Sequence, residues 1–281
     1  MKIINQKALL EAEIKAIKVI SKTIGFVPTM GALHQGHLML VKQAVAENDI
    51  CVVSIFVNPT QFNNVADLEK YPRNLERDTA LLQSVGCDLV FAPDPDEIYA
   101  SDEVNRRFDF DFNGLDKVME GKFRPGHFNG VVQIVSKLFS LIQPDKAYFG
   151  EKDFQQLAII HHMTKTMNFG IKIVDCPIVR EPSGLAMSSR NERLSAGQRK
   201  NAAEISKVLF ESRNFAAQMA PHELTKWVTD KLNAVEGLDV EYYEIVNSTS
   251  LQSLQEWNEP AVGCIAVFCG EVRLIDNIRY N

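Results

Sequence analysis

The sequence predicts an α/β protein, in which a doubly wound parallel sheet is followed by a smaller α+β region. Short apolar runs alternate with segments of helical periodicity up to residue 176, a pattern typical of βαβ units. The run at 50–57 (ICVVSIFV) is almost wholly apolar, as in parallel strands that helices cover on both faces. After Arg180 the pattern changes to two long helices and three strands.

The elements of the first part follow from their periodicity and from their breakers. The N-terminal stretch 1–18 predicts the start of a strand and an amphipathic helix, because its charges are scattered among apolar positions. Proline stands at or just beyond the end of several apolar runs, as in Asn58-Pro59 and at Pro93. The predicted strands are 23–29, 50–57, 88–92, 147–150 and 171–176, and the predicted helices are 38–47, 74–84, 128–142 and 154–167.

The second part predicts two helices and three mostly antiparallel strands. One helix spans 195–219 with Ser195 as its N-cap, and the next spans 221–235 with Pro221 in its first turn. The strands are 240–246, 261–269 and 271–278. Because no Gly/Ser linker separates the two parts, we expect a boundary between residues 176 and 184 and close packing.

Composition excludes several classes of protein. Of 281 residues, 46% are hydrophobic and 23% are charged, so the chain can bury a core and is not disordered. The net charge of −6 gives no overall attraction for polyanions, so no nucleic-acid partner is expected. No apolar run approaches the roughly 18–20 residues of a membrane span, and no signal peptide is evident. The odd number of cysteines, five in mostly apolar runs, predicts buried thiols in a reducing compartment, the cytoplasm.

The segment 28–37 (PTMGALHQGH) lies between a buried strand and a helix. Ligands of open parallel sheets bind beyond the carboxyl ends of strands. Gly31 allows close backbone approach, Gly36 relieves crowding where the helix begins, and a helix N-terminus attracts phosphate. His34 and His37 are three residues apart, so they share a face and can donate to phosphoryl oxygens. A metal-binding pair or two solvated histidines are the alternatives.

Two further segments carry cations and hydroxyls. Lys152, in the segment 150–153 (GEKD), follows a short strand and could neutralise charge on a phosphoryl group. The segment 187–190 (MSSR) follows Pro182-Ser183-Gly184 at the expected boundary, and its hydroxyls and guanidinium are good phosphate partners. In isolation, a solvated turn is the favoured interpretation of 150–153, and a Ser-rich loop with one arginine, such as 187–190, is commonplace.

Amides follow the apolar run that ends at Val57. Asn58 and Gln61 could fix a carboxylate or a hydroxyl group, or could serve only turn chemistry and the surface. The segment 124–130 (RPGHFNG) predicts a tight loop before a helix. Its histidine, His127, is either structural or faces a substrate.

Taken together, these segments resemble one enzyme family. The stretches PTMGALHQGH, FVNPTQF, YPRN, RPGHFNGV, YFGEKDFQQ and GLAMSSRN, in this order and spacing, are similar to those of the pantothenate synthetases. These are nucleotidyltransferases with HIGH-type and KMSKS-type signatures. Residues 34–37 match the first signature and residues 187–190 match the second. The resemblance covers residues 23–195 motif by motif.

The resemblance implies a Rossmann-like nucleotide-binding catalytic domain over 1–178, and a smaller α+β C-terminal domain over 179–281 that closes over the site. It implies an ATP-dependent condensation of pantoate with β-alanine to pantothenate, AMP and pyrophosphate, in the supply of coenzyme A precursors. The chemistry requires a pantoyl adenylate, because a carboxylate and an amine do not form an amide unaided. It also implies Mg²⁺ bridging phosphate oxygens, and a homodimer formed through the N-terminal domain.

The resemblance also assigns residues. Gln61 and Gln156 would hold pantoate, with Gln61 bordering the β-alanine position and Asn58 also binding substrate. In the family His37 is a proton donor; we interpret it as a stabiliser of the transition state, because a phosphoryl leaving group needs charge relief more than a proton. Asp78 is the candidate for a metal contact, directly or through water. The catalytic set would be His34, His37, Lys152, Ser188, Ser189 and Arg190. The ATP site would comprise these six with Met30, Gly31, Ala32, Leu33, Gln35, Gly36, Gly150, Glu151, Asp153, Val179 and Met187, of which Met30, Gly150, Asp153, Val179 and Met187 line the adenosine pocket.

Two other functions fit the same features. One is a different adenylyl or cytidylyl transferase, which would act on a phosphorylated acceptor. The other is a non-enzymatic ATP-binding or regulatory protein that keeps the scaffold. The two glutamines, with no arginine cluster beside them, argue against the first. The retention of His34, His37, Lys152 and Arg190 argues against the second.

Overall fold

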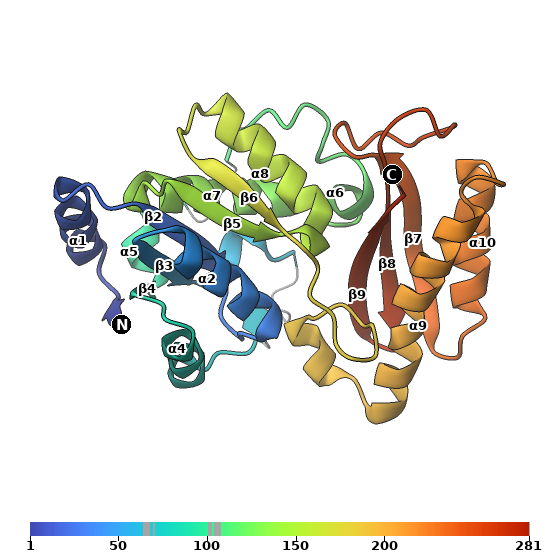
Figure 1. Ribbon diagram of the computed structural model, residues 1–281, viewed down its shortest axis with the longest axis horizontal. Helices are drawn as coiled ribbons and strands as arrows, with labels where there is room; N and C mark the ends of the chain where they lie inside the picture. Colours follow the sequence, from blue (N-terminus) through green and yellow to red (C-terminus); the bar gives the residue numbers. More distant parts are fainter. Residues whose placement is uncertain (64–67, 70, 101–102, 104–107, 281) are drawn as a thin grey trace. The chain divides into compact units, whose positions relative to one another are not determined.

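A computed structural model describes residues 1–63, 68–69, 71–100, 103 and 108–280 (Figure 1). In the first part of the chain its elements are β1 (Lys2–Ile4), α1 (Lys7–Val19), β2 (Ile24–Thr29), α2 (Gln35–Glu47), β3 (Ile50–Ile55), the 3₁₀ turn η1 (Pro59–Gln61), α4 (Leu75–Ser84), β4 (Leu89–Phe91), α5 (Pro95–Ile98), α6 (Met119–Phe123), α7 (His127–Ile142), β5 (Lys146–Gly150), η2 (Glu151–Asp153), α8 (Phe154–Thr166) and β6 (Lys172–Cys176). The second part comprises η3 (Ser189–Arg193), α9 (Ala196–Ser212), η4 (Arg213–Phe215), α10 (Pro221–Asn233), β7 (Leu238–Asn247), β8 (Ala261–Cys269) and β9 (Val272–Arg279).

The first sheet has six parallel strands in the order β1-β4-β3-β2-β5-β6. The chain moves outward from β2 in both directions, so the order reverses between β2 and β5. Such a switch point opens a crevice beyond the carboxyl ends of the strands, where open α/β sheets bind ligands. The loop 30–34 leaves β2 at this point and leads into α2. The predicted doubly wound sheet is therefore confirmed.

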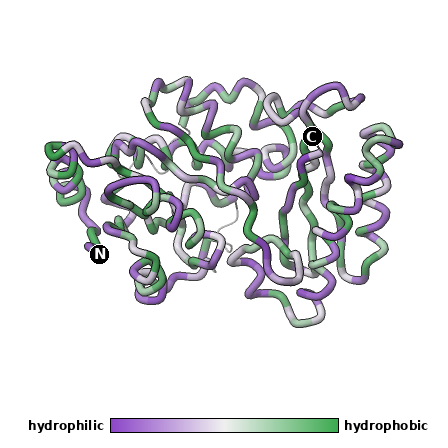
Figure 2. Tube along the Cα trace, viewed as in Figure 1, coloured by the Kyte–Doolittle hydropathy of each residue, from purple (hydrophilic) through white to green (hydrophobic). Residues whose placement is uncertain are grey.

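Helices cover both faces of this sheet, as the apolar strands require. Phe26 of β2 meets Phe139 of α7 edge-on, with ring centroids 6.3 Å apart. The next residue, Val27, packs in a separate cluster with Leu38 and Val41 of α2. Successive strand residues point to opposite faces, so α7 and α2 lie on opposite sides. Figure 2 shows the hydropathy along these strands and helices.

The second sheet is antiparallel, in the order β7-β8-β9. Its core joins apolar residues of α9 and α10 to alternate residues of β9, among them Val272, Leu274 and Ile278. The predicted small α+β region is thus present. The single helix predicted over 195–219 is wrong in its length: α9 ends at Ser212, where the chain turns and Phe215 packs on Trp227 with centroids 4.8 Å apart.

The chain divides into two compact units. One comprises residues 1–116, 121–150 and 156–176, and the other comprises residues 117–120, 151–155 and 177–281. The segment 151–155, which carries Lys152, therefore groups with the C-terminal sheet, although the sequence placed it in the first domain. All five cysteines are buried thiols, as predicted. In the described part of the chain, no helix is long and apolar enough to cross a membrane.

Candidate active site

The loop that follows β2 in the first unit is fixed by one buried carboxylate. Gly31 and Ala32 both have positive φ, of 78° and 50°. Asp78, 2% exposed, accepts the N–H of Ala32 at 2.9 Å and that of Leu33 at 2.8 Å. A Cβ at Gly31 would lie 2.9 Å from the same carboxylate, so glycine is required there. The carboxylate thus holds the backbone in a conformation that is otherwise costly.

These hydrogen bonds give Asp78 a role that the sequence did not predict. Each of its oxygens accepts one backbone N–H and keeps a further lone pair. The metal contact suggested for Asp78 is therefore neither required nor excluded by this geometry, and it stays a prediction. Among the described residues there is no cluster of three or more His, Cys, Asp or Glu side chains that could hold a metal ion.

Two imidazole rings stand at the first turn of α2. His34 is the N-cap residue, and its Nδ1 accepts the N–H of Gly36 at 3.1 Å. The Nδ1 of His37 accepts the N–H of His34 at 3.4 Å, and the ring centroids are 4.1 Å apart. A ring nitrogen that accepts a hydrogen bond carries no proton, so each neutral ring carries its proton on Nε2. The two rings therefore supply a pair of Nε2–H donors at a helix N-terminus.

Asn58, after the end of β3, is 1% exposed, and hydrogen bonds occupy its whole amide. Its Nδ2 donates to Gln61 Oε1 at 3.2 Å and to the Gly130 carbonyl at 3.0 Å. Its Oδ1 accepts from the hydroxyls of Tyr99 at 2.7 Å and Thr60 at 3.2 Å. Burial raises the pKa of Tyr99 to about 12, which keeps that hydroxyl a donor. Asn58 therefore positions Gln61, and its direct contact with substrate stays a prediction.

Gln61 is also held through its main chain. Its carbonyl lies 2.8 Å from Nδ1 of His127, and because a carbonyl only accepts, the histidine donates. His127 is 6% exposed, and this hydrogen bond gives it a structural role; that it also faces a substrate stays a prediction. The Nε2 of Gln61 points toward Sδ of Met30 at 3.0 Å, which brings residues of two predicted motifs together.

A cavity of about 310 Å³ opens at this edge of the sheet in the first unit. Its lining includes Met30, Gly31 and Asp78, together with residues that end β3 and follow β4. The loops after these strands all leave from the carboxyl edge of the sheet, where the sequence predicted ligand binding.

In the second unit, Lys152 occupies the middle of η2. Its Nζ lies 3.2 Å from Oδ2 of Asp153, and its side chain is 17% exposed. Because that carboxylate is half-exposed and belongs to the same turn, the ammonium can redirect its charge toward a polyanion at little cost.

The segment 187–190 follows a tight hairpin, also in the second unit. The N–H of Met187 donates to the Val179 carbonyl at 3.0 Å. Ser188 is the N-cap of η3, and its Oγ accepts the N–H of Arg190 at 3.2 Å. Asn191, 2% exposed, donates to Glu181 and to the Ala186 carbonyl. Val179 and Met187 are thus neighbours, and their assignment to the adenosine pocket stays a prediction.

The structure therefore gathers the predicted residues into two groups. Met30, Asn58, Gln61, Asp78 and the two histidines belong to the first unit. Lys152, Asp153, Val179 and residues 187–190 belong to the second. Gly150 ends β5, and Gln156 lies half-buried in the first turn of α8.

Sequence reasoning missed the residues that hold this geometry, among them Tyr99, Thr60, Gly130 and Asn191. The glycine at position 130 was the one sequence signal of such a contact. A Cβ there would lie 2.4 Å from the Thr60 carbonyl oxygen, so α7 can approach η1 only through a glycine. The motif RPGHFNGV contains this glycine, but the sequence alone does not reveal its partner.

Comparison with known proteins shows the family of this chain. The family model Pantoate-beta-alanine ligase matches residues 2–279. Pantothenate synthetase of Bacteroides fragilis (strain YCH46) is 56% identical over 283 residues, covering 100% of this chain and 99% of the relative. The crystal structure of pantothenate synthetase from Thermus thermophilus is 42% identical with a TM-score of 0.92, covering 100% of this chain and 99% of that one.

A second solved structure contains ligands. It is the pantoate-beta-alanine ligase of Francisella tularensis, complexed with beta-gamma ATP and beta-alanine. It is 35% identical with a TM-score of 0.84, and the match covers 100% of this chain and 98% of that one. With the family model spanning nearly every residue and relatives matched over their full length, the chain belongs to the pantoate–β-alanine ligase family, the pantothenate synthetases.

Proposed function

We propose that this protein joins pantoate to β-alanine in two steps, through a pantoyl adenylate. A pantoate carboxylate oxygen attacks the α-phosphorus of ATP, and the bond to the β-phosphate oxygen breaks to release pyrophosphate. The β-alanine nitrogen then attacks the acyl carbon, loses a proton to solvent, and displaces AMP. The Francisella tularensis relative was solved with beta-gamma ATP and beta-alanine, which supports ATP and β-alanine as ligands of this chain.

The observation that carries the proposal is the pair of Nε2–H donors at the start of α2. In the first step a carboxylate approaches a polyphosphate, so donors must relieve the charge that builds on phosphoryl oxygens. His34 and His37 are locked by backbone hydrogen bonds through Nδ1, so they are oriented before substrate arrives. Neutral donors of this kind act by hydrogen bonding, which supports the role of His37 as a stabiliser of the transition state.

The other roles follow from the chemistry of each side chain. Gln61, held by Asn58 and His127, presents an amide suited to the hydroxyl and carboxylate groups of pantoate, and Gln156 would join it. Lys152 and Arg190 would neutralise phosphate charge, with Ser188 and Ser189 donating to phosphate oxygens. Met30, Gly150, Asp153, Val179 and Met187 would contact adenosine.

Mg²⁺ fits this site as a companion of ATP. Magnesium prefers phosphate oxygens and water with one or two carboxylates, and the described residues offer no three-carboxylate cage. The phosphates would therefore supply most of its ligands, with Asp78 as the protein's candidate contact through water. When bound, the ion neutralises phosphate charge.

The assembly and location are also proposals. We propose a homodimer formed through the first unit, which size-exclusion chromatography with light scattering would test. Five buried thiols suit a reducing compartment, and we propose the cytoplasm.

The reaction is tested by following both products from ATP. With pantoate alone, we expect one burst of pyrophosphate and no steady release of AMP. Adding β-alanine should start continuous formation of AMP and pantothenate. Pyrophosphate release that requires β-alanine would reject the two-step scheme, and release with a phosphorylated acceptor in place of pantoate would favour another nucleotidyltransferase.

A further inference from the structure

The strand β9 carries two sets of side chains with different partners. Val272, Leu274 and Ile278 belong to the C-terminal core. The alternate residues bind the segments 117–120 and 151–155, which group with this unit. Arg273 forms two hydrogen bonds with Glu120, at 2.6 and 2.9 Å, and Arg279 contacts Glu151 at 2.7 Å.

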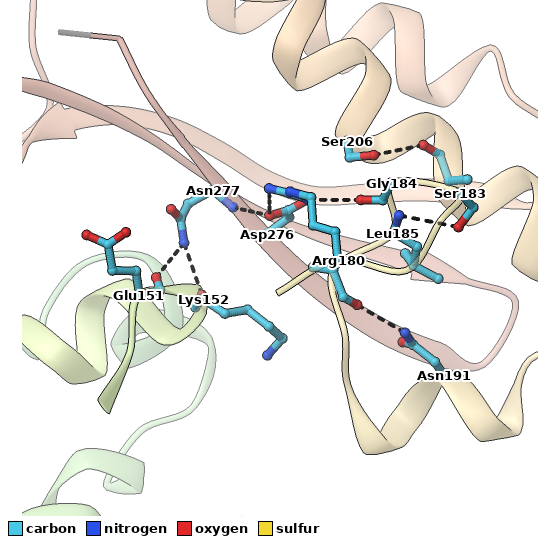
Figure 3. Close-up of polar contacts among 12 residues, drawn as sticks. Glu151, Lys152, Arg180, Ser183, Gly184, Leu185, Asn191, Ser206, Asp276 and Asn277 are labelled. Carbon is cyan, nitrogen blue, oxygen red and sulfur yellow. Dashed lines mark hydrogen bonds and ion pairs between the residues drawn. The ribbon is translucent and has the colours of Figure 1, made fainter. Parts of the chain in front are cut away.

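Asn277 lies between those two arginines in the same alternate set. It is 5% exposed. Its Nδ2 donates to the carbonyl of Glu151 at 2.8 Å and to that of Lys152 at 3.1 Å (Figure 3). Both amide hydrogens are thus used on consecutive carbonyls of η2. Two fixed peptide planes set the direction of the Cα–Cβ bond of Lys152.

The preceding residue anchors Asn277 in turn. Asp276 is 4% exposed and accepts the N–H of Asn277 at 2.8 Å. It also binds Arg180 through both oxygens, at 2.6 and 2.9 Å. Figure 3 shows Arg180 reaching on to the carbonyl of Gly184, at 3.1 Å. The hairpin of Arg180 leads into Ser188 and Arg190, so one dipeptide of β9 contacts η2 through Asn277 and the start of this hairpin through Asp276.

The buried pair of Asp276 and Arg180 has a high desolvation cost if its only role is to stabilise the fold. Asp276 occupies the set of positions shared with Leu274 and Ile278, where an apolar side chain would suit the core. A buried ion pair is often no more stabilising than apolar residues of similar size. Polar side chains that give fixed directions are the means by which a site holds its reacting groups.

We propose that Asn277 is a positioning residue that aims Lys152 at the phosphates of ATP. The proposal rests on the proposed function, since it requires that Lys152 act in adenylation. Asn277 touches no reacting atom in this account; it acts through the peptide carbonyls of η2. Asp276, which Arg180 holds, accepts the backbone N–H of Asn277 and so fixes the position of that residue.

The test is a double-mutant cycle on single-turnover pyrophosphate release from ATP and pantoate. Asn277→Ala removes both donors, and we expect it to slow release about tenfold to hundredfold, the scale of a misplaced catalytic group. In a Lys152→Ala background, the same change should slow release by less than about threefold. Asn277→Ser, which restores one donor, should be intermediate.

Ser212→Ala is the matched control. Ser212 is also buried in this unit, and its hydroxyl bonds the Leu209 carbonyl and Tyr280, on the side of α9 rather than at η2. Thermal melting should show similar stability losses in Asn277→Ala and Ser212→Ala, whereas only Asn277→Ala should slow release. Reaction of pre-formed pantoyl adenylate with β-alanine should be nearly unchanged in both.

Three results would overturn the proposal. They are equal slowing by the Ser212 and Asn277 variants, an Asn277 effect of the same size with and without Lys152, and equal slowing of both half-reactions. If Asn277→Ala does not fold, the cycle is run with Asn277→Ser, for which the same coupling is required. Failure of the wild-type protein to release pyrophosphate with pantoate is a different result, because it rejects the proposed function before any variant is compared.

Discussion

The two units hold their candidate site residues in different ways. In the first unit, His34 and His37 are oriented by backbone groups within three residues of themselves. In the second unit, the turn of Lys152 is held by Asn277, which lies 125 residues further along the chain. The first unit supplies neutral N–H donors and amides, and the second supplies cations.

The two kinds of group have different requirements: a neutral donor depends on its direction, whereas a cation acts mainly through its charge. A neutral donor is effective only when it points at its acceptor, so local capping of a helix start suits it. A cation acts over a longer range, but a long flexible side chain needs its base fixed if it is to serve one phosphate. We therefore expect changes in the second unit to affect phosphate chemistry, and changes at Gln61 to affect recognition of pantoate.

The largest effect is expected at Lys152. Lys152→Ala should slow single-turnover pyrophosphate release by roughly two to three orders of magnitude, the scale for loss of one strong electrostatic stabiliser. Lys146→Ala is the control, because this lysine pairs with Glu47 at 3.0 Å and has no assigned role. Release within about threefold of wild type would remove Lys152 from the phosphate site.

Replacing Arg190 should affect the two half-reactions differently. Only the first involves the β- and γ-phosphates, so Arg190→Ala should slow pyrophosphate formation about a hundredfold and leave pantoyl adenylate aminolysis much less affected. Rapid-quench measurement of both steps provides the check, with Arg213→Ala as a control arginine of the same unit. Equal slowing of both steps would instead mean that Arg190 shapes the site as a whole.

Replacing Gln61 should weaken the use of pantoate much more than the binding of ATP. Gln61→Ala removes an amide that Asn58 and His127 hold in place, so turnover or binding of pantoate should weaken by about tenfold or more. ATP affinity, measured by calorimetry, should hardly change. The exposed Gln83 on α4 supplies the control substitution. An equal loss of ATP binding would contradict the assignment of Gln61 to pantoate.

The smallest effect is expected at the other end of α2. Hydrogen bonds from Gln43 and then Lys146 lower the pKa of Glu47 from 4.5 to about 2. A lowered carboxyl pKa stabilises the fold above the unfolded value, and that stability is lost as pH falls from 4.5 toward 2. Because the side chain is 35% exposed, Glu47→Gln should cost only about 0.5–1 kcal/mol near neutral pH.

Urea unfolding of the wild type and Glu47→Gln at about pH 7, 5 and 3.5 measures this contribution. The difference in stability should be similar at the two higher values and smaller at the lowest. A difference that grows on acidification would show that the carboxylate is not stabilised in the fold. Catalytic rates should be unchanged, since this end of α2 is remote in sequence from residues 34–37.

Much of the fold could be predicted because its signals are local. The apolar runs of β3 and β8 and the periodicity of α7 depend only on neighbouring residues, and they indicated the strands, helices and fold class. Likewise, the spacing of His34 and His37 placed both rings on one helical turn. The end of α9 at Ser212 was not evident from the periodicity, because the following residues form a 3₁₀ turn in which Phe215 contacts Trp227, a residue of another helix.

The sequence by itself determined which chemical groups the protein has and the order in which strands and helices present them. Tertiary structure alone decided that Asp78 fixes the loop after β2, that Asn58 serves Gln61, and that the Lys152 turn is held by β9. The reason is physical: capping follows from backbone geometry within one turn, whereas hydrogen bonds between distant segments depend on strand register and on the packing of whole elements.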